Sequence, residues 1–287
     1  MIKNIPDSFN KEIIDVVNSF AGQASVSIEN SRLMLEAIET ERYKEEIKIA
    51  RTVQKSLLPQ QLEYDRNFQI SALSESADEV GGDYYDTFRL SENKIAVVIA
   101  DVSGHGTSAA FNMAQLRGIF QAVIQMNFEP DEALCQMNNA LSRCLGTKTF
   151  ITMSLLYIDT ADQTIQFSRA GHCPSIYYSA RTKQAHFLEN KGLGLGILRS
   201  GDFKKYLEVF RYHYEKEDVI LLYTDGIVEA KNNLNEEYGY DRLKVSLTEK
   251  TSMLPVKIVR EVTNDLYAFC GSRKPNDDYS CVAIKFV

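Results

Sequence analysis

The stretch KIAVVIADVSGHG, residues 94–106, places an apolar run directly before an aspartate and a glycine-rich turn. A continuous apolar run predicts a strand that is buried on both faces, so Asp101 is expected to emerge where this strand ends. The turn Gly104-His105-Gly106 then leads into a helix, and a helix N-terminus favours anions. The stretch therefore predicts a functional residue at one end of a buried strand.

Three further acidic motifs lie far from this one in the chain, namely GGDYYD at 81–86, YTDG at 223–226 and NDDYS at 276–280. Any one of them alone is most simply an ordinary turn. Carboxylates gathered from distant segments repel one another, however, and oxygen-rich sites suit hard cations such as Mg²⁺ or Mn²⁺. Two such cations can activate water for in-line attack at phosphorus, so no nucleophile motif is required. The four motifs together predict a metal-dependent hydrolase.

Length and composition indicate an ordinary globular protein. The 287 residues are 44% hydrophobic and 25% charged, which is enough for one large domain or two small ones. A net charge of −7 argues against nucleic-acid binding, and no apolar run approaches the roughly 18 residues of a membrane span. The first residues lack the apolar core that a signal peptide needs, and the five cysteines are widely spaced without a CxxC pair. We therefore expect a cytoplasmic protein with reduced thiols and no zinc site.

A long helix is predicted at the N-terminus, because residues 8–58 contain no proline and Pro59 ends the pattern. The apolar and small residues recur in steps of three and four, slip once by five, and then continue: Ile14, Val17, Ala21, Ala24, Ile28, Ser31, Leu35, Ile38, Tyr43, Ile47, Ala50, Gln54 and Leu57. This spacing predicts the seam of a parallel coiled-coil homodimer over residues 11–57. The alternative is an amphipathic helix folded back on the rest of the chain.

The slip between Ile38 and Tyr43 offers two seam registers of similar energy. We therefore expect the helix to act as a switch that controls metal occupancy in the following domain, together with residues 108–125. The alternative is a passive tether. The predicted domains are a linker helix at 1–58 and a catalytic domain at 59–287.

The remainder of the chain reads as short strands with few helices. Strands are expected at 68–73, 84–90, 94–101, 150–159, 164–170, 175–179, 185–189, 206–214, 218–224 and 279–287. Helices are expected at 108–125, 130–145 and 255–270. The absence of a regular βαβ alternation predicts an α+β fold, a sandwich of antiparallel sheets with helices outside.

The order and separation of the motifs resemble a known family. GGDYYD, ADVSGHG, AGHCP at 170–174, YTDGIVEA and DDYS are similar to the motifs of the metal-dependent Ser/Thr protein phosphatases, the PPM family, and more closely to its SpoIIE/RsbU-type branch. ARTVQKSLLP at 50–59 is typical of that branch, and FAGQASVSIENSRL at 20–33 resembles the closing helix of a GAF sensory domain. The resemblance implies an α-β-β-α sandwich with a two-metal site at one end.

The resemblance also implies roles for individual residues. Two Mn²⁺ or Mg²⁺ ions would be held by Asp83 as the bridge and by Asp101, the Val102 carbonyl, Asp225 and Asp277, with Asp278 as second choice. Asp83, Asp101 and Asp225 would also be catalytic. His105 is a candidate for protonating the leaving alkoxide, and the alternative is that it only caps or packs.

The implied function is a phosphoserine/phosphothreonine protein phosphatase. Its implied substrate is a small phosphorylated STAS-type anti-sigma-factor antagonist in bacterial partner switching. GGDYY also suggests a diguanylate cyclase, but that signature needs an acidic residue where Tyr84 stands. The other alternative is a catalytically silent phosphatase-like module that dimerises and binds partners.

Three details complete the comparison with the family pattern. Arg66 is the nearest arginine on the N-terminal side of GGDYYD, so the guanidinium clamp of some related phosphatases has no evident counterpart and phosphate recognition is expected to fall on the metals. His172 in AGHCP is expected to support the cleft without taking part in chemistry. GLGLG at 192–196 lacks nucleotide-loop spacing and is expected to be a mobile flap.

Overall fold

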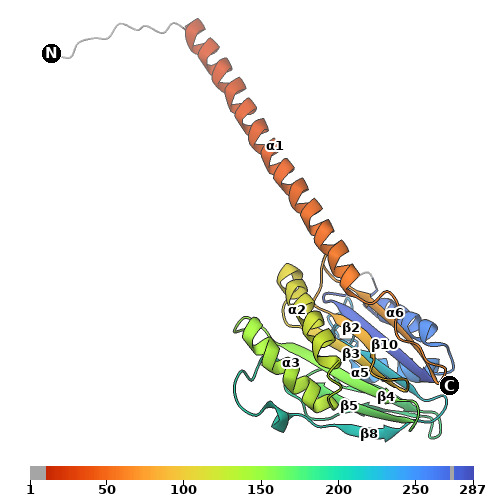
Figure 1. Cartoon of the computed structure of the whole chain (residues 1–287). Helices are drawn as coiled ribbons and strands as arrows, with labels where there is room; N and C mark the ends of the chain where they lie inside the picture. Colours follow the sequence, from red (N-terminus) through yellow and green to blue (C-terminus); the bar gives the residue numbers. More distant parts are fainter. Residues whose placement is uncertain (1–10, 272–274) are drawn as a thin grey trace. The chain divides into compact units, whose positions relative to one another are not determined.

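The computed structural model describes residues 11–271 and 275–287 (Figure 1). The chain forms two compact units that meet between Ile49 and Ala50. Helix α1, Lys11–Leu57, makes up the described part of the first unit, and its last two turns belong to the second. The long helix predicted from the seam pattern is confirmed, while a domain boundary at 58/59 stays a prediction. None of the helices in the described ranges is long and apolar enough to cross a membrane.

The second unit is built from two five-stranded antiparallel sheets, as predicted. One sheet has the strand order β1-β10-β9-β6-β7 and the other β2-β3-β4-β5-β8. The strands are β1 Phe68–Glu75, β2 Tyr84–Arg89, β3 Lys94–Val102, β4 Ile151–Asp159, β5 Thr164–Ala170, β6 Ser175–Ser179, β7 Gln184–Leu188, β8 Phe210–His213, β9 Val219–Tyr223 and β10 Tyr279–Phe286. The helices are α2 Gly106–Ile124, α3 Pro130–Cys144, α4 Asp225–Val228, α5 Gly239–Lys250 and α6 Pro255–Cys270, with a 3₁₀ turn η1 at Phe203–Tyr206.

The core has three layers, which explains the continuous apolar run in β3. Ile95, Val97 and Ile99 point between the two sheets, while Ala96 and Val98 point toward α2 and α3 on the other face. Helices α5 and α6 cover the β1-β10-β9-β6-β7 sheet in the same way (Figure 1). Because side chains alternate across a strand, a strand that is covered on both faces must be apolar at every position. The α-β-β-α sandwich is thus confirmed.

Two predictions about local structure need correction. Residues 206–214 were expected to form one strand, but only Phe210–His213 does so, because η1 closes a turn in which the Leu207 amide donates to the Lys204 carbonyl. Helices α4 and α5 were missed. Helix α5 buries only one narrow stripe, including Leu243 and Leu247, so its sequence has a weak helical period.

We expect Leu222→Ala to destabilise the sandwich strongly. Leu222 is fully buried between the sheets, and a Leu→Ala cavity costs about 2–5 kcal/mol of unfolding free energy. Urea unfolding of the full chain would measure this loss. Leu254→Ala is the control, because Leu254 is 54% exposed and its loss is expected to cost less than about 1 kcal/mol. Equal effects from the two variants would contradict the assignment of the core.

Candidate metal centre

Two of the predicted aspartates are neighbours at one end of the β2–β3 pair. Tyr84 pairs with Ala100 in the antiparallel register, so Asp83, just before β2, lies beside Asp101 near the end of β3. Val102 follows with its side chain buried. A side chain on Gly82 would come within 2.8 Å of the Val102 carbonyl oxygen, so only glycine allows this close approach. The first two motifs therefore meet as predicted.

The other two acidic motifs meet at the end of the β9–β10 pair. Cys281 pairs with Tyr223, so Asp225, just after β9, comes close to Asp277, which precedes β10. The Thr224 amide donates to the Ser280 carbonyl at 3.0 Å and extends the ladder by one step. Asp225 is the first residue of the short helix α4. This places its carboxylate at the same edge of the sandwich as Asp101, whose carboxylate it repels.

One hydrogen bond links the acidic ends of the two sheets. The Thr224 hydroxyl donates to Oδ2 of Asp83 at 2.8 Å and accepts the Ser280 amide at 2.8 Å. Asp83 is 5% exposed, and among the described residues its Oδ1 atom has no hydrogen-bond partner. A buried carboxylate oxygen without a partner is costly, and a cation is a natural partner for it. Sequence reasoning missed Thr224, although it stands inside the YTDG motif.

The acidic side chains raise one another's pKa values. Burial, and then the charge of Asp101, raise the pKa of Asp83 well above its usual value. Burial, followed by Asp225 and Asp277, raises the pKa of Asp101 to about 7. Burial and Asp277 likewise raise the pKa of Asp225. Carboxylates that disfavour ionisation in this way are those that a bound cation would relieve.

The donor set fits hard divalent cations, because every candidate ligand is an oxygen. In the part of the chain that the structure describes, however, no three acidic, histidine or cysteine side chains are already arranged closely enough to hold an ion. An ion at this edge would require the carboxylates to turn toward one another, at a cost in free energy.

The Asp278 carboxylate is already engaged by backbone amides. Its oxygens accept the Ala77 amide at 2.9 Å and the Gly82 amide at 2.7 Å. A side chain on Gly226 would lie 1.9 Å from the Asp278 carbonyl oxygen, which explains the glycine after Asp225. Asp278 thus positions the loop that carries Asp83. These bonds favour Asp277, which is exposed, as the metal ligand of this pair.

Gln54, near the end of α1, is bound to the same loop. Its side-chain amide donates to the Gly81 carbonyl, and its Oε1 atom accepts the Gly81 amide at 3.1 Å. Gln54 is 8% exposed, unlike most of α1. A polar residue at a seam position was a signal for this contact that the sequence analysis left unused. The end of α1 is therefore fastened two residues before Asp83.

The His105 side chain is available for chemistry. It precedes α2 without capping it by a side-chain hydrogen bond, and its side chain is 88% exposed. Its Nδ1 atom lies 3.7 Å from Oδ2 of Asp78. Neither capping nor packing therefore accounts for this histidine. Gly104 and Gly106 on either side have φ values of 98° and 70°, which place the imidazole on a sharp turn.

The AGHCP and GLGLG segments have structural contacts, as far as the described residues show. The His172 ring is buried between the Thr152 hydroxyl at 2.8 Å and the Tyr223 carbonyl at 2.9 Å, and burial lowers its pKa to about 4. His172 thus supports the strand end that carries Thr224 and Asp225. Leu195 exchanges two backbone hydrogen bonds with Ile151, so the segment expected to be a flap is tied to β4.

The comparisons with known proteins identify the family and the fold. The family model described as Stage II sporulation protein E (SpoIIE) matches residues 91–287. The phosphoserine phosphatase RsbU of Bacillus subtilis is 33% identical over 188 residues, which are 66% of this chain and 55% of RsbU. RsbP, a phosphoserine phosphatase of the same organism, is 27% identical over 70% of this chain and 49% of RsbP. The chain spans about half the length of these curated relatives.

Solved structures share the fold. The SiaA-PP2C domain of Pseudomonas aeruginosa has a TM-score of 0.76 at 17% identity, covering 88% of this chain and 99% of that one. The structure of the RsbU and RsbW domains of a Mycobacterium tuberculosis protein has a TM-score of 0.65 at 27% identity. The match covers 77% of this chain and 60% of that one. The fold is that of the PP2C/PPM phosphatases. Within that class, the chain belongs to the SpoIIE family. The likeness of residues 20–33 to a GAF helix stays a prediction.

We expect Asp101→Asn to stabilise the metal-free protein at high pH. The folded pKa of about 7 exceeds the ordinary 3.8, so the unfolded chain loses this proton first as pH rises. As pH rises between these two pKa values, the wild-type protein therefore loses unfolding free energy, and the loss is complete above the folded pKa. Asparagine does not ionise. The variant should gain on the order of 1–4 kcal/mol relative to wild type between about pH 4 and pH 8.

Urea unfolding in EDTA across this pH range would measure the difference. Asp162→Asn, at an exposed turn position, is the matched control. A constant difference between Asp101→Asn and wild type at every pH would contradict the raised pKa.

Proposed function

We propose that this chain is a Mn²⁺- or Mg²⁺-dependent phosphoserine/phosphothreonine protein phosphatase. The observation that carries the proposal is the buried Oδ1 of Asp83, which has no hydrogen-bond partner among the described residues and lies beside Asp101 at the acidic edge of both sheets. The residues that would hold two ions are Asp83, Asp101 with the Val102 carbonyl, Asp225 and Asp277. Family membership supports this assignment, as do the phosphoserine phosphatase names of RsbU and RsbP.

Each protein group has a distinct task in the proposed reaction. Bound cations supply positive charge that makes water more acidic and offsets the phosphoryl oxygens. Thr224 holds Asp83 in place, and Asp278 shapes its loop through the Gly82 amide. His105, oriented by Asp78, donates the proton to the departing serine or threonine oxygen.

The proposed substrate is a phosphorylated STAS-domain protein, an anti-sigma-factor antagonist of bacterial partner switching in the cytoplasm. RsbU-type relatives support this choice, and the Mycobacterium tuberculosis relative carries RsbU and RsbW domains in one protein. The net charge of −7 suits a protein partner with a basic docking face more than a nucleic acid.

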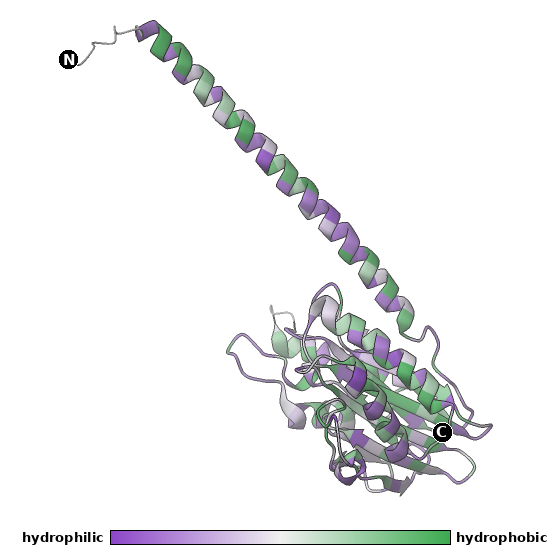
Figure 2. Cartoon of the chain, turned by 60° about the vertical axis from the view of Figure 1, so that its left-hand side comes forward, coloured by the Kyte–Doolittle hydropathy of each residue, from purple (hydrophilic) through white to green (hydrophobic). Residues whose placement is uncertain are grey.

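The proposed oligomer is a homodimer through residues 11–57. Apolar side chains along α1 are exposed in the single chain, among them Val17 at 53%, Ile28 at 71% and Leu35 at 64%. Figure 2 shows such hydrophobic residues distributed along the length of the helix. A helix of 47 residues with this pattern gains stability by burying the stripe against a second copy.

Removing either central ligand is expected to abolish activity while the fold remains. Asp225→Ala and Asp101→Ala should each lower Mn²⁺-dependent turnover of p-nitrophenyl phosphate by about two orders of magnitude or more. Circular dichroism would confirm the fold, and Asp162→Ala is the control. Near-normal turnover in either variant would overturn the site assignment. If the unaltered chain showed no turnover either with or without Mn²⁺, a catalytically silent binding module would be favoured instead.

The helix is expected to control activity through Gln54. A chain that begins at Gln60 should be monomeric and less active on a phosphorylated STAS protein, because it lacks both the seam and the bond to Gly81. Gln54→Ala should stay dimeric but need more Mn²⁺ for half-maximal turnover, because the Asp83 loop is less well held. Light scattering and Mn²⁺ titrations would measure these effects. A passive tether would leave activity and metal dependence equal in all three proteins.

A further inference from the structure

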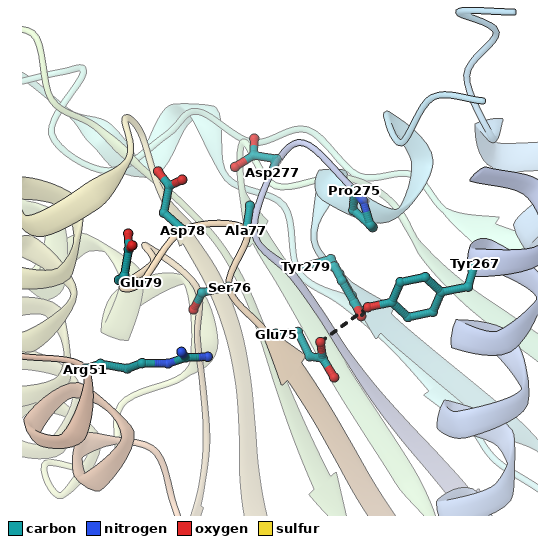
Figure 3. A pocket seen from close by; sticks show the side chains of 10 residues that line it. All are labelled: Arg51, Glu75, Ser76, Ala77, Asp78, Glu79, Tyr267, Pro275, Asp277 and Tyr279. Atoms are coloured by element: carbon teal, nitrogen blue, oxygen red, sulfur yellow. Dashed lines mark hydrogen bonds between the residues drawn. The ribbon is translucent and has the colours of Figure 1, made fainter. Parts of the chain in front are cut away.

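A pocket of about 370 Å³ opens beside the candidate metal centre. The loop between β1 and β2 lines it with Ser76, Asp78 and Glu79, and the segment before β10 lines it with Asp277. Arg51, from α1, lines it as well, and its side chain extends into the space that these residues surround (Figure 3). An arginine therefore lies near the site, although the nearest one in sequence on that side of GGDYYD is Arg66.

The position of Arg51 is fixed by its neighbour on the next turn of the helix. Gln54, three residues on, is bound to Gly81 at both its amide nitrogen and its oxygen. Residues three apart share a helix face, so this contact also directs Arg51 toward the β1–β2 loop. Within the described ranges, no ion pair or hydrogen bond engages the Arg51 guanidinium. Its five donors therefore remain available to a ligand.

The charges around the pocket set a condition on its ligand. Glu75, Asp78, Glu79 and Asp277 all line it, so any anionic ligand would meet repulsion there unless cations are bound. The proposed phosphatase function makes a phosphoryl group that ligand, because the proposed cations at Asp277 would offset the repulsion at this edge. The planar guanidinium binds phosphoryl oxygens in a bidentate manner that lysine cannot reproduce.

We propose that Arg51 is a substrate-binding residue that contacts the phosphoryl group from the α1 side of the pocket. This inference rests on the proposed phosphatase function and adds a residue to it. It also places a phosphate-binding side chain on the helix that is proposed to dimerise. Any displacement of the end of α1 would then remove the guanidinium from the pocket together with the Gln54 contact.

The test compares Arg51→Ala, Arg51→Lys and Lys55→Ala in the full chain with saturating Mn²⁺. Lys55 lies one turn further along the same helix face and outside the pocket, so its loss removes the same charge without the contact. Arg51→Ala should raise both the KM for p-nitrophenyl phosphate and the inhibition constant for inorganic phosphate about tenfold. Arg51→Lys should recover part of this loss, and Lys55→Ala should match wild type. The Mn²⁺ concentration for half-maximal turnover should stay unchanged in all three.

The possible results separate the two proposals. Unchanged phosphate inhibition in Arg51→Ala, with normal wild-type turnover, would reject the role of Arg51 alone. A loss confined to phosphoprotein substrates would also reject it, because p-nitrophenyl phosphate carries only the phosphoryl group. A shift in Mn²⁺ dependence without a change in phosphate inhibition would show a structural role instead. Absence of Mn²⁺-dependent turnover in the unaltered chain would reject the phosphatase function, and Arg51 with it.

Discussion

The hydrogen bond from the Thr224 hydroxyl to the Asp83 carboxylate connects the two sheets at the point where their acidic ends meet. Thr224 extends β9, whereas Asp83 precedes β2 in the opposite sheet, so this contact depends on how the sheets stack. It satisfies one oxygen of Asp83 and leaves the other buried without a partner among the described residues. The candidate centre is thus built around a carboxylate that the protein positions but does not neutralise.

Close backbone packing supports this arrangement. Gly82 and Gly226 have no room for a side chain, because a Cβ atom would lie 2.8 Å from the Val102 carbonyl oxygen and 1.9 Å from the Asp278 carbonyl oxygen, respectively. The Asp278 carboxylate uses both oxygens on backbone amides of the neighbouring loop. Glycine and aspartate therefore have different tasks within one motif. The glycines allow the backbones to approach closely, and Asp278 holds the neighbouring loop. The other aspartates are the candidates for binding cations.

The end of α1 belongs to the catalytic unit by its contacts. Gln54 binds both the backbone N–H and the backbone C=O of Gly81, which lies two residues before Asp83. Arg51 reaches the adjacent pocket from the same helix face. A displacement of this end of the helix would therefore reach the loop that carries Asp83 through Gln54. Regulation by the helix would therefore need no contact with the ions.

The sequence by itself determined most strands and helices, the sandwich of antiparallel sheets and the four acidic motifs. These features depend on local periodicity and turn chemistry, as in the β3 run before Asp101. Tertiary structure decided which carboxylates are held by distant loops. Asp277 and Asp278 are neighbours in sequence, but only Asp278 is buried and accepts the amides of Ala77 and Gly82. It also brought Arg51, Gln54 and Thr224 to this edge. Gln54 stands out in sequence as a polar residue at a seam position, but partners 27 or 141 residues apart cannot be identified from local spacing.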